Sequence, residues 1–168
     1  VELDPSVVLL IFEKEGAYNH MKQFAAQLRV KVEIWCSRGS PSFEFQVKIP
    51  KANQVLVFTD LNPGGAHIYL SICKGRPNIH WGGLFCSQVT RYGLKLSPCD
   101  AKNYPSFETV SNKCNPNDLY RVLGELNLMR NANINVELQQ LFDEQRLCSL
   151  VEEELEKLQL SIPLTNPG

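Results

Sequence analysis

Short segments in the first half of the chain alternate apolar and polar residues with a period of two. In residues 43–49 (Phe-Glu-Phe-Gln-Val-Lys-Ile) every odd position is apolar and every even position is polar. Successive side chains of a strand point to opposite faces, so this pattern predicts a strand with one apolar face. Residues 30–36 and 67–73 alternate in the same way, and residues 55–59 are a further strand candidate.

The connections between these segments predict how the strands pair. They are short and rich in turn residues, as in the Asn-Pro-Gly-Gly sequence of residues 62–65. Such connections suit neighbouring antiparallel strands and are too short for the crossover that joins parallel strands. With further strands expected within 79–86 and 91–97, the sequence predicts one antiparallel sheet of about five or six strands.

A period near 3.6 residues predicts helices on both sides of this sheet region. Residues 17–28 have one apolar face, and a second helix begins after Asn115-Pro116. A third helical segment, roughly 135–160, carries a stripe of apolar residues. Residues 7–12 are apolar all round, so either a buried strand or a helix fits them.

These elements predict an α+β fold in which an N-terminal helix and a C-terminal helical pair pack on the apolar face of the antiparallel sheet. The alternative is a β-sandwich head with a helical extension. We expect a mainly antiparallel β domain with an N-terminal helix over residues 1–115. A helical segment over 116–160 is expected to dock on the same domain, followed by a flexible tail over 161–168.

Composition is that of a globular protein, with 43% hydrophobic and 21% charged residues. The longest apolar run has six residues, so no membrane span is expected. Residues 1–99 carry eleven Lys and Arg against seven Asp and Glu, whereas residues 100–168 carry six against eleven. The six cysteines follow no paired spacing and no glycosylation sequon is present, which favours an intracellular protein, cytoplasmic or nuclear, over a secreted one.

No ordered catalytic or metal-binding motif is present. The sequence has neither Cys-x-x-Cys nor a glycine-rich phosphate loop, so we expect no metal and no cofactor. The most enzyme-like stretch is residues 80–86, where Cys86 could act as a nucleophile with a histidine as its base. A bend at Gly82-Gly83 followed by a buried Cys86 explains the same residues more simply. We therefore expect a protein without catalytic activity.

Two features indicate a protein-interaction or scaffold module of an intracellular complex. Trp35 and Tyr69 lie on the nominally polar face of the sheet, where a partner could bury them. The acidic C-terminal helix carries apolar residues at spacings that suit either docking on its own domain or a short coiled coil with a partner or a second copy. The residues of this stripe are Leu141, Cys148, Val151, Leu155 and Leu158.

A nucleic-acid-binding domain is the alternative. Basic side chains interleave with the two aromatic residues on the same face of the predicted sheet, an arrangement that suits phosphates and stacked bases. The basic residues of this set are Arg29, Lys31, Lys48 and His67. A thiol-dependent enzyme around Cys86 is the third possibility.

Overall fold

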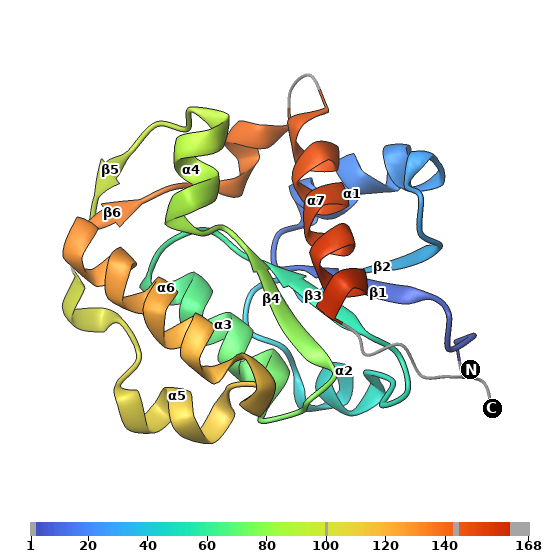
Figure 1. The fold of residues 1–168 in the computed structure, drawn as a ribbon, viewed down its shortest axis with the longest axis horizontal. Coiled ribbons are helices and arrows are strands. Elements are labelled where there is room, and N and C mark those ends of the chain that lie inside the picture. Colours follow the sequence, from blue (N-terminus) through green and yellow to red (C-terminus); the bar gives the residue numbers. More distant parts are fainter. Residues whose placement is uncertain (1–2, 100, 143–144, 162–168) are drawn as a thin grey trace.

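The computed structural model describes residues 3–99, 101–142 and 145–161 and has a parallel sheet at its centre (Figure 1). The four strands of this sheet lie in the order β2–β1–β3–β4, and every neighbouring pair is parallel. Their bounds are β1 Val8–Phe12, β2 Val32–Cys36, β3 Val55–Phe58 and β4 Ile79–Gly83. The predicted antiparallel sheet of five or six strands is therefore wrong, and so is the β-sandwich alternative.

Helices form the crossovers that parallel strands require. They are α1 (Glu15–Phe24) between β1 and β2, α2 (Phe43–Lys48) between β2 and β3, and α3 (Pro63–Cys73) between β3 and β4. The chain continues through α4 (Cys86–Tyr92), α5 (Phe107–Lys113), α6 (Leu119–Ala132) and α7 (Arg146–Ser161). Two-residue strands β5 (Ser97–Pro98) and β6 (Ile134–Asn135) pair antiparallel beside the main sheet, and short 3-10 turns occupy 25–27, 101–103, 116–118 and 138–141.

Both faces of the sheet are covered. On one face the Trp81 ring stacks on Tyr69 of α3, and Trp35 meets Phe45 of α2 edge-on. Helices α1 and α7 contact each other on the opposite side. All residues of β1 and β3 are buried, as is typical of parallel strands covered on two faces. Residues 7–12, which either a strand or a helix could explain, thus contain a central strand.

Residues 43–49 form helix α2 and not the predicted strand. An alternating heptapeptide also places apolar residues four apart, so that Phe45 and Ile49 turn inward together while Phe43 and Val47 face solvent. Ser42 begins the helix, because its hydroxyl accepts a hydrogen bond from the Phe45 N–H at 3.1 Å. The pattern was therefore ambiguous between the two periods.

Residues 67–73 lie in helix α3, so this predicted strand is also wrong. Asn62 is the N-cap and accepts a hydrogen bond from the Gly65 N–H at 2.7 Å, while Pro63 occupies the first helical turn. The stretch expected to be a loop is thus a helix start. Of the strand expected within 91–97 only Ser97 belongs to β5, since α4 extends to Tyr92.

Several other elements agree with the sequence pattern. Helix α1 and the turn after it fall within or next to 17–28, β2, β3 and β4 lie in three of the predicted strand regions, and α6 follows Asn115-Pro116. No helix among the described residues is long and apolar enough to cross a membrane. Residues 162–168 of the tail predicted over 161–168 lie outside the described residues.

Candidate functional site

The strand order creates a topological switch point between β1 and β3. The connection after β1 leads to β2 on one side, and the connection after β3 leads to β4 on the other side. In open parallel sheets, ligands bind outside the carboxyl ends of the strands at this point. The residues that follow the two strands here are Glu13 and Lys14 after β1, and Thr59 and Asp60 after β3.

Two carboxylates and one ammonium group meet at the switch point. The Asp60 N–H donates to Glu13 Oε1 at 2.6 Å, and Lys14 Nζ lies 2.5 Å from Asp60 Oδ2. The Leu138 N–H donates to Asp60 Oδ1 at 2.7 Å. Glu13 and Asp60 are only 5% and 3% exposed. Both acidic groups are thus held in place from β1, β3 and the chain after β6.

This cluster has an excess of negative charge. Burial raises the pKa of Glu13, the Asp60 N–H lowers it in part, and the charge of Asp60 raises it again. For Lys14, burial opposes the charge, but the hydrogen bond and charge of Asp60, with Glu13 and Glu137, raise its pKa. One lysine therefore faces more acidic groups than it neutralises, which favours a second cation at this place.

Gly65 and Thr59 fix the position of Asp60 at the start of α3. A Cβ atom on Gly65 would lie 2.1 Å from the Asp60 carbonyl oxygen, so only glycine allows this approach. The Thr59 hydroxyl accepts a hydrogen bond from Trp81 Nε1 at 3.1 Å. These contacts fix the end of β3 and, with it, the direction of the Asp60 side chain.

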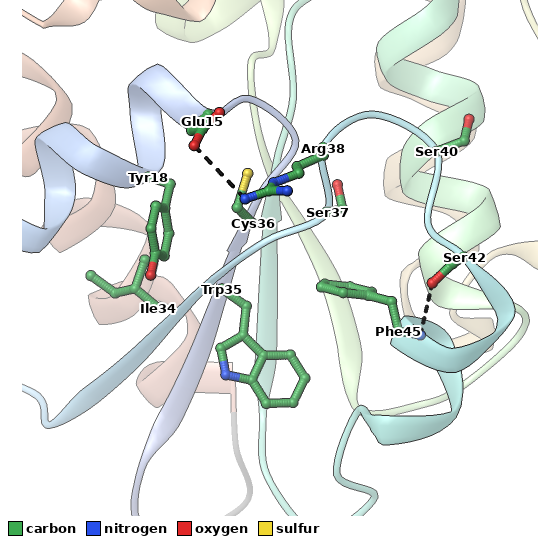
Figure 2. A pocket seen from close by; sticks show the side chains of 10 residues that line it. All are labelled: Glu15, Tyr18, Ile34, Trp35, Cys36, Ser37, Arg38, Ser40, Ser42 and Phe45. Carbon is green, nitrogen blue, oxygen red and sulfur yellow. Dashed lines mark hydrogen bonds and ion pairs between the residues drawn. The ribbon is translucent and has the colours of Figure 1, made fainter.

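A pocket of about 520 Å³ adjoins this cluster at the carboxyl end of β2 (Figure 2). Arg38 and Gly39 have positive φ angles of 55° and 83°, and the turn that they form brings the Gly39 N–H to 2.8 Å from the Glu13 carbonyl oxygen. Arg38 also lies 3.8 Å from Glu15. The lining further includes the serines Ser37, Ser40 and Ser42 and the aromatic residues Tyr18, Trp35 and Phe45.

The pocket combines groups that suit a nucleotide. Arg38 has a largely exposed guanidinium group, which can bind a phosphate with two parallel hydrogen bonds. The rings of Trp35 and Phe45, 5.8 Å apart, offer flat apolar surface beside it. A base can stack on such rings while its phosphate binds Arg38 in the same pocket.

The donor set fits a hydrated divalent cation better than a fully protein-bound one. No group of three or more His, Cys, Asp or Glu side chains within 3–99, 101–142 and 145–161 could hold a metal ion. Mg²⁺ usually keeps several waters and uses one or two protein carboxylates together with phosphate oxygens of a ligand. Glu13 and Asp60 could supply those two carboxylates.

The residues expected to bind protein lie mostly in the interior. Tyr69 is buried under Trp81, with ring centroids 5.0 Å apart. Trp35 is half-buried and lines the pocket. The whole C-terminal stripe is buried in the core of this chain: Leu141, Cys148, Val151, Leu155 and Leu158.

The basic residues of the nucleic-acid alternative are spread over several elements. Arg29 and Lys31 precede β2, Lys48 ends α2, and His67 lies on α3 with its Nε2 2.9 Å from the Asn103 carbonyl oxygen. The structure does not gather them on one face of a sheet. The pocket at the carboxyl end of β2 contains a basic residue outside this set, Arg38, at the opposite end of the strand from Lys31.

The surroundings of Cys86 do not favour a nucleophile. Burial and the charge of Glu125 raise the pKa of the thiol, which keeps it protonated. His80 has its Nδ1 2.6 Å from Asp118 Oδ2 and its Nε2 2.8 Å from Gln54 Oε1, so neither ring nitrogen is free to act as a base for Cys86. Gly82, two residues after His80, lies against the Phe58 ring, because a Cβ atom on Gly82 would be 2.6 Å from that ring.

Sequence reasoning missed Glu13, Lys14, Asp60 and Arg38. The available signal was the pair of wholly apolar runs, 8–12 and 55–58, each followed at once by charged or polar residues. It points to a site only when both strands are parallel, because then their carboxyl ends share one edge. The chain matches no known protein-family model, and a search of curated proteins finds no relative.

Proposed function

We propose that this chain binds a divalent cation at the switch point and, through it, the phosphate of a nucleotide or of a nucleic-acid strand. The observation that carries the proposal is the buried pair of Glu13 and Asp60, for which Lys14 is the single close counter-ion among the residues that the structure describes. Burying an unbalanced negative charge is costly, and a bound cation removes that cost.

The adjoining pocket supports the phosphate part of the proposal. A cation on two carboxylates keeps open positions for phosphate oxygens. The turn that carries Arg38 is joined to the end of β1, because the Gly39 N–H donates to the Glu13 carbonyl oxygen at 2.8 Å. Trp35 and Phe45 supply the surface for a base. The proposal concerns binding and assigns no bond-breaking step to these residues.

Calorimetric titration with Mg²⁺ tests the cation site. We expect binding by the wild type and a loss of at least about tenfold in affinity in Glu13→Gln, which keeps an oxygen for the Asp60 N–H but removes the charge. The matched control is Glu108→Gln, an exposed position on α5. Equal Mg²⁺ affinity in the wild type and in Glu13→Gln would refute the site.

Quenching of tryptophan fluorescence tests the phosphate ligand, because Trp35 lines the pocket while Trp81 is buried. A nucleoside diphosphate and a short single-stranded oligonucleotide are separate arms, each with and without Mg²⁺. We expect Mg²⁺-dependent quenching that Arg38→Ala weakens. Quenching that is the same with and without Mg²⁺ would contradict the proposed role of the cation.

A non-catalytic protein-interaction module stays the second candidate. The observation in its favour is the outer face of α2, where Phe43 is 76% and Val47 is 59% exposed. Such side chains can anchor a partner. Phe43→Ala with Val47→Ala would then reduce partner recovery from an extract and leave Mg²⁺ binding unchanged.

We also propose that the protein works in a reducing, intracellular compartment. No disulfide joins the six cysteines, all of which lie within the described residues, and three of them, Cys73, Cys114 and Cys148, are buried. We expect six free thiols when the native protein is unfolded and titrated without reductant. A count of four or fewer would indicate disulfides and an oxidising compartment.

A further inference from the structure

Strand β2 lies at one edge of the sheet and has one open side. The Lys31 carbonyl accepts a hydrogen bond from the Val8 N–H at 3.1 Å, and the Ser37 N–H donates to the Phe12 carbonyl at 3.0 Å. Bonding residues alternate along a parallel strand, so the backbone groups of Val32, Ile34 and Cys36 point away from β1. In the part of the chain that the structure describes, no other strand pairs with this side.

The side chains along this edge form a self-complementary pattern about Val32. One face carries Lys31 and Glu33, both exposed, on either side of Val32. The other face is apolar and half-buried, with Val30 and Ile34 flanking Val32. Turning a second β2 strand antiparallel about Val32 therefore places unlike charges opposite each other twice, and apolar residues opposite each other on the other face.

We infer that two copies of this chain associate through the open edges of β2, with Val32 opposite Val32 of the partner subunit. The outward backbone groups of each Val32 then bond to the other strand. Lys31 of each copy faces Glu33 of the partner subunit, and Ile34 faces Val30 of the partner subunit. The two parallel sheets become one continuous sheet with a two-fold axis at its centre.

Charge complementarity selects this occupant and this register. A strand pair centred on Glu33 would place two glutamates opposite each other, and a pair centred on Ile34 would leave Lys31 opposite Ser37 with no opposite charge. Charged residues usually protect an open edge from pairing with other strands. Here Lys31 and Glu33 disfavour pairing with a strand that lacks the complementary charges, but they form two opposite-charge pairs with a second copy of this strand.

Sedimentation across a range of protein concentrations, combined with charge reversal, tests the inference. We expect a reversible dimer for the wild type. Lys31→Glu and Glu33→Lys alone should each weaken dimerisation by about tenfold or more, since each turns both charge pairs into like-charge pairs. The double variant Lys31→Glu/Glu33→Lys restores opposite charges and should restore the dimer.

A proline variant tests the backbone bonds separately. Val32→Pro removes the outward N–H without removing a bond to β1 and should abolish the dimer, whereas Val32→Ala, the matched control, keeps that N–H. Circular dichroism identifies any variant that fails to fold, and the charge-reversal set then decides. A monomeric wild type at all concentrations would overturn the inference, and so would a double variant as weak as the single ones. Glu13 is not part of the β2 edge, so Glu13→Gln should leave the dimer unchanged even if it no longer binds Mg²⁺.

Discussion

Glu13 is a buried side chain whose negative charge costs stability. Its carboxylate accepts the Asp60 N–H in an interior position where a second carboxylate lies close by. Burial raises the pKa of Glu13, so ionising this side chain costs more free energy in the folded protein than in the unfolded chain. The stability that this difference contributes is present below the ordinary pKa of 4.5 and is lost as the pH rises through the raised value.

Glu13→Gln is therefore expected to stabilise the cation-free protein near pH 7, because the neutral amide avoids the cost of burying a charge at this position. Urea unfolding at pH 7 and at pH 4 checks this, because the gain should shrink at the lower pH, where the wild-type side chain is protonated. Glu108→Gln is the surface control and should change little at either pH. A less stable Glu13→Gln at pH 7 would show that its charge is already compensated.

Lys14→Met removes the ammonium group that lies 2.5 Å from Asp60 Oδ2. We expect a loss of about 1–2 kcal/mol, reduced from the value of a fully buried pair because the lysine side chain is 48% exposed. Added Mg²⁺ should recover part of the loss. Thermal unfolding with and without Mg²⁺ measures both effects, and Lys51→Met, in an exposed loop, is the control. No Mg²⁺-dependent recovery would argue against a cation at this place.

At the scale of elements, the end of β3 and the start of α3 form one unit. Gly65→Ala would force the new Cβ against the Asp60 carbonyl oxygen and should destabilise the fold by about 3 kcal/mol or more. Gly64→Ala, one residue earlier, meets only the Asn62 side chain at 3.4 Å and should be nearly neutral. Chemical unfolding of the two variants separates the close approach from a general effect of alanine. Equal losses would contradict it.

The elements also show where sequence reasoning succeeded. The alternation of 30–36 correctly predicted a strand. The edge strand β2 has two faces that differ in exposure: Lys31 and Glu33 are exposed, whereas Val32 and Ile34 on the other face are half-buried. The same alternation in 43–49 and 67–73 was misleading, since apolar residues at i and i+4 satisfy a helix as well. Helix-start signals at Ser42 and at Asn62-Pro63 would have decided both cases.

At the scale of the whole molecule, the C-terminal helix α7 belongs to the same core as the sheet. Leu155 is buried on α7, whereas Leu128 on α6 is 54% exposed. Leu155→Ala should cost about 2–5 kcal/mol and leave the oligomeric state unchanged, and Leu128→Ala should change stability by less than about 0.5 kcal/mol. Unfolding curves with light scattering measure both. A change of oligomeric state with little loss of stability would instead indicate an intermolecular helix seam.

The error in sheet type explains why the candidate site was missed. The apolar runs of β1 and β3 are visible in the sequence. If residues 43–49 and 67–73 were strands, the connections between strands would be short and would favour antiparallel pairing, but these residues lie in helices α2 and α3. With parallel strands, Glu13, Asp60 and Arg38 come to the carboxyl end of the sheet, although 25 positions separate Glu13 from Arg38 and 47 positions separate it from Asp60. Such proximity follows from topology and cannot be obtained from local spacing.

The most direct test of the cation site is an NMR titration with Mn²⁺, whose unpaired electrons broaden the signals of nearby amides. We expect the signals of Glu13, Lys14, Asp60 and Leu61 to broaden first in the wild type, and this early broadening to be absent in Glu13→Gln. The competing acidic residues lie on α7, where Glu156 is exposed, Glu152 and Glu153 are half-buried and Glu154 is buried. Broadening that begins on α7, or that is unchanged in Glu13→Gln, would contradict the cation site at the switch point.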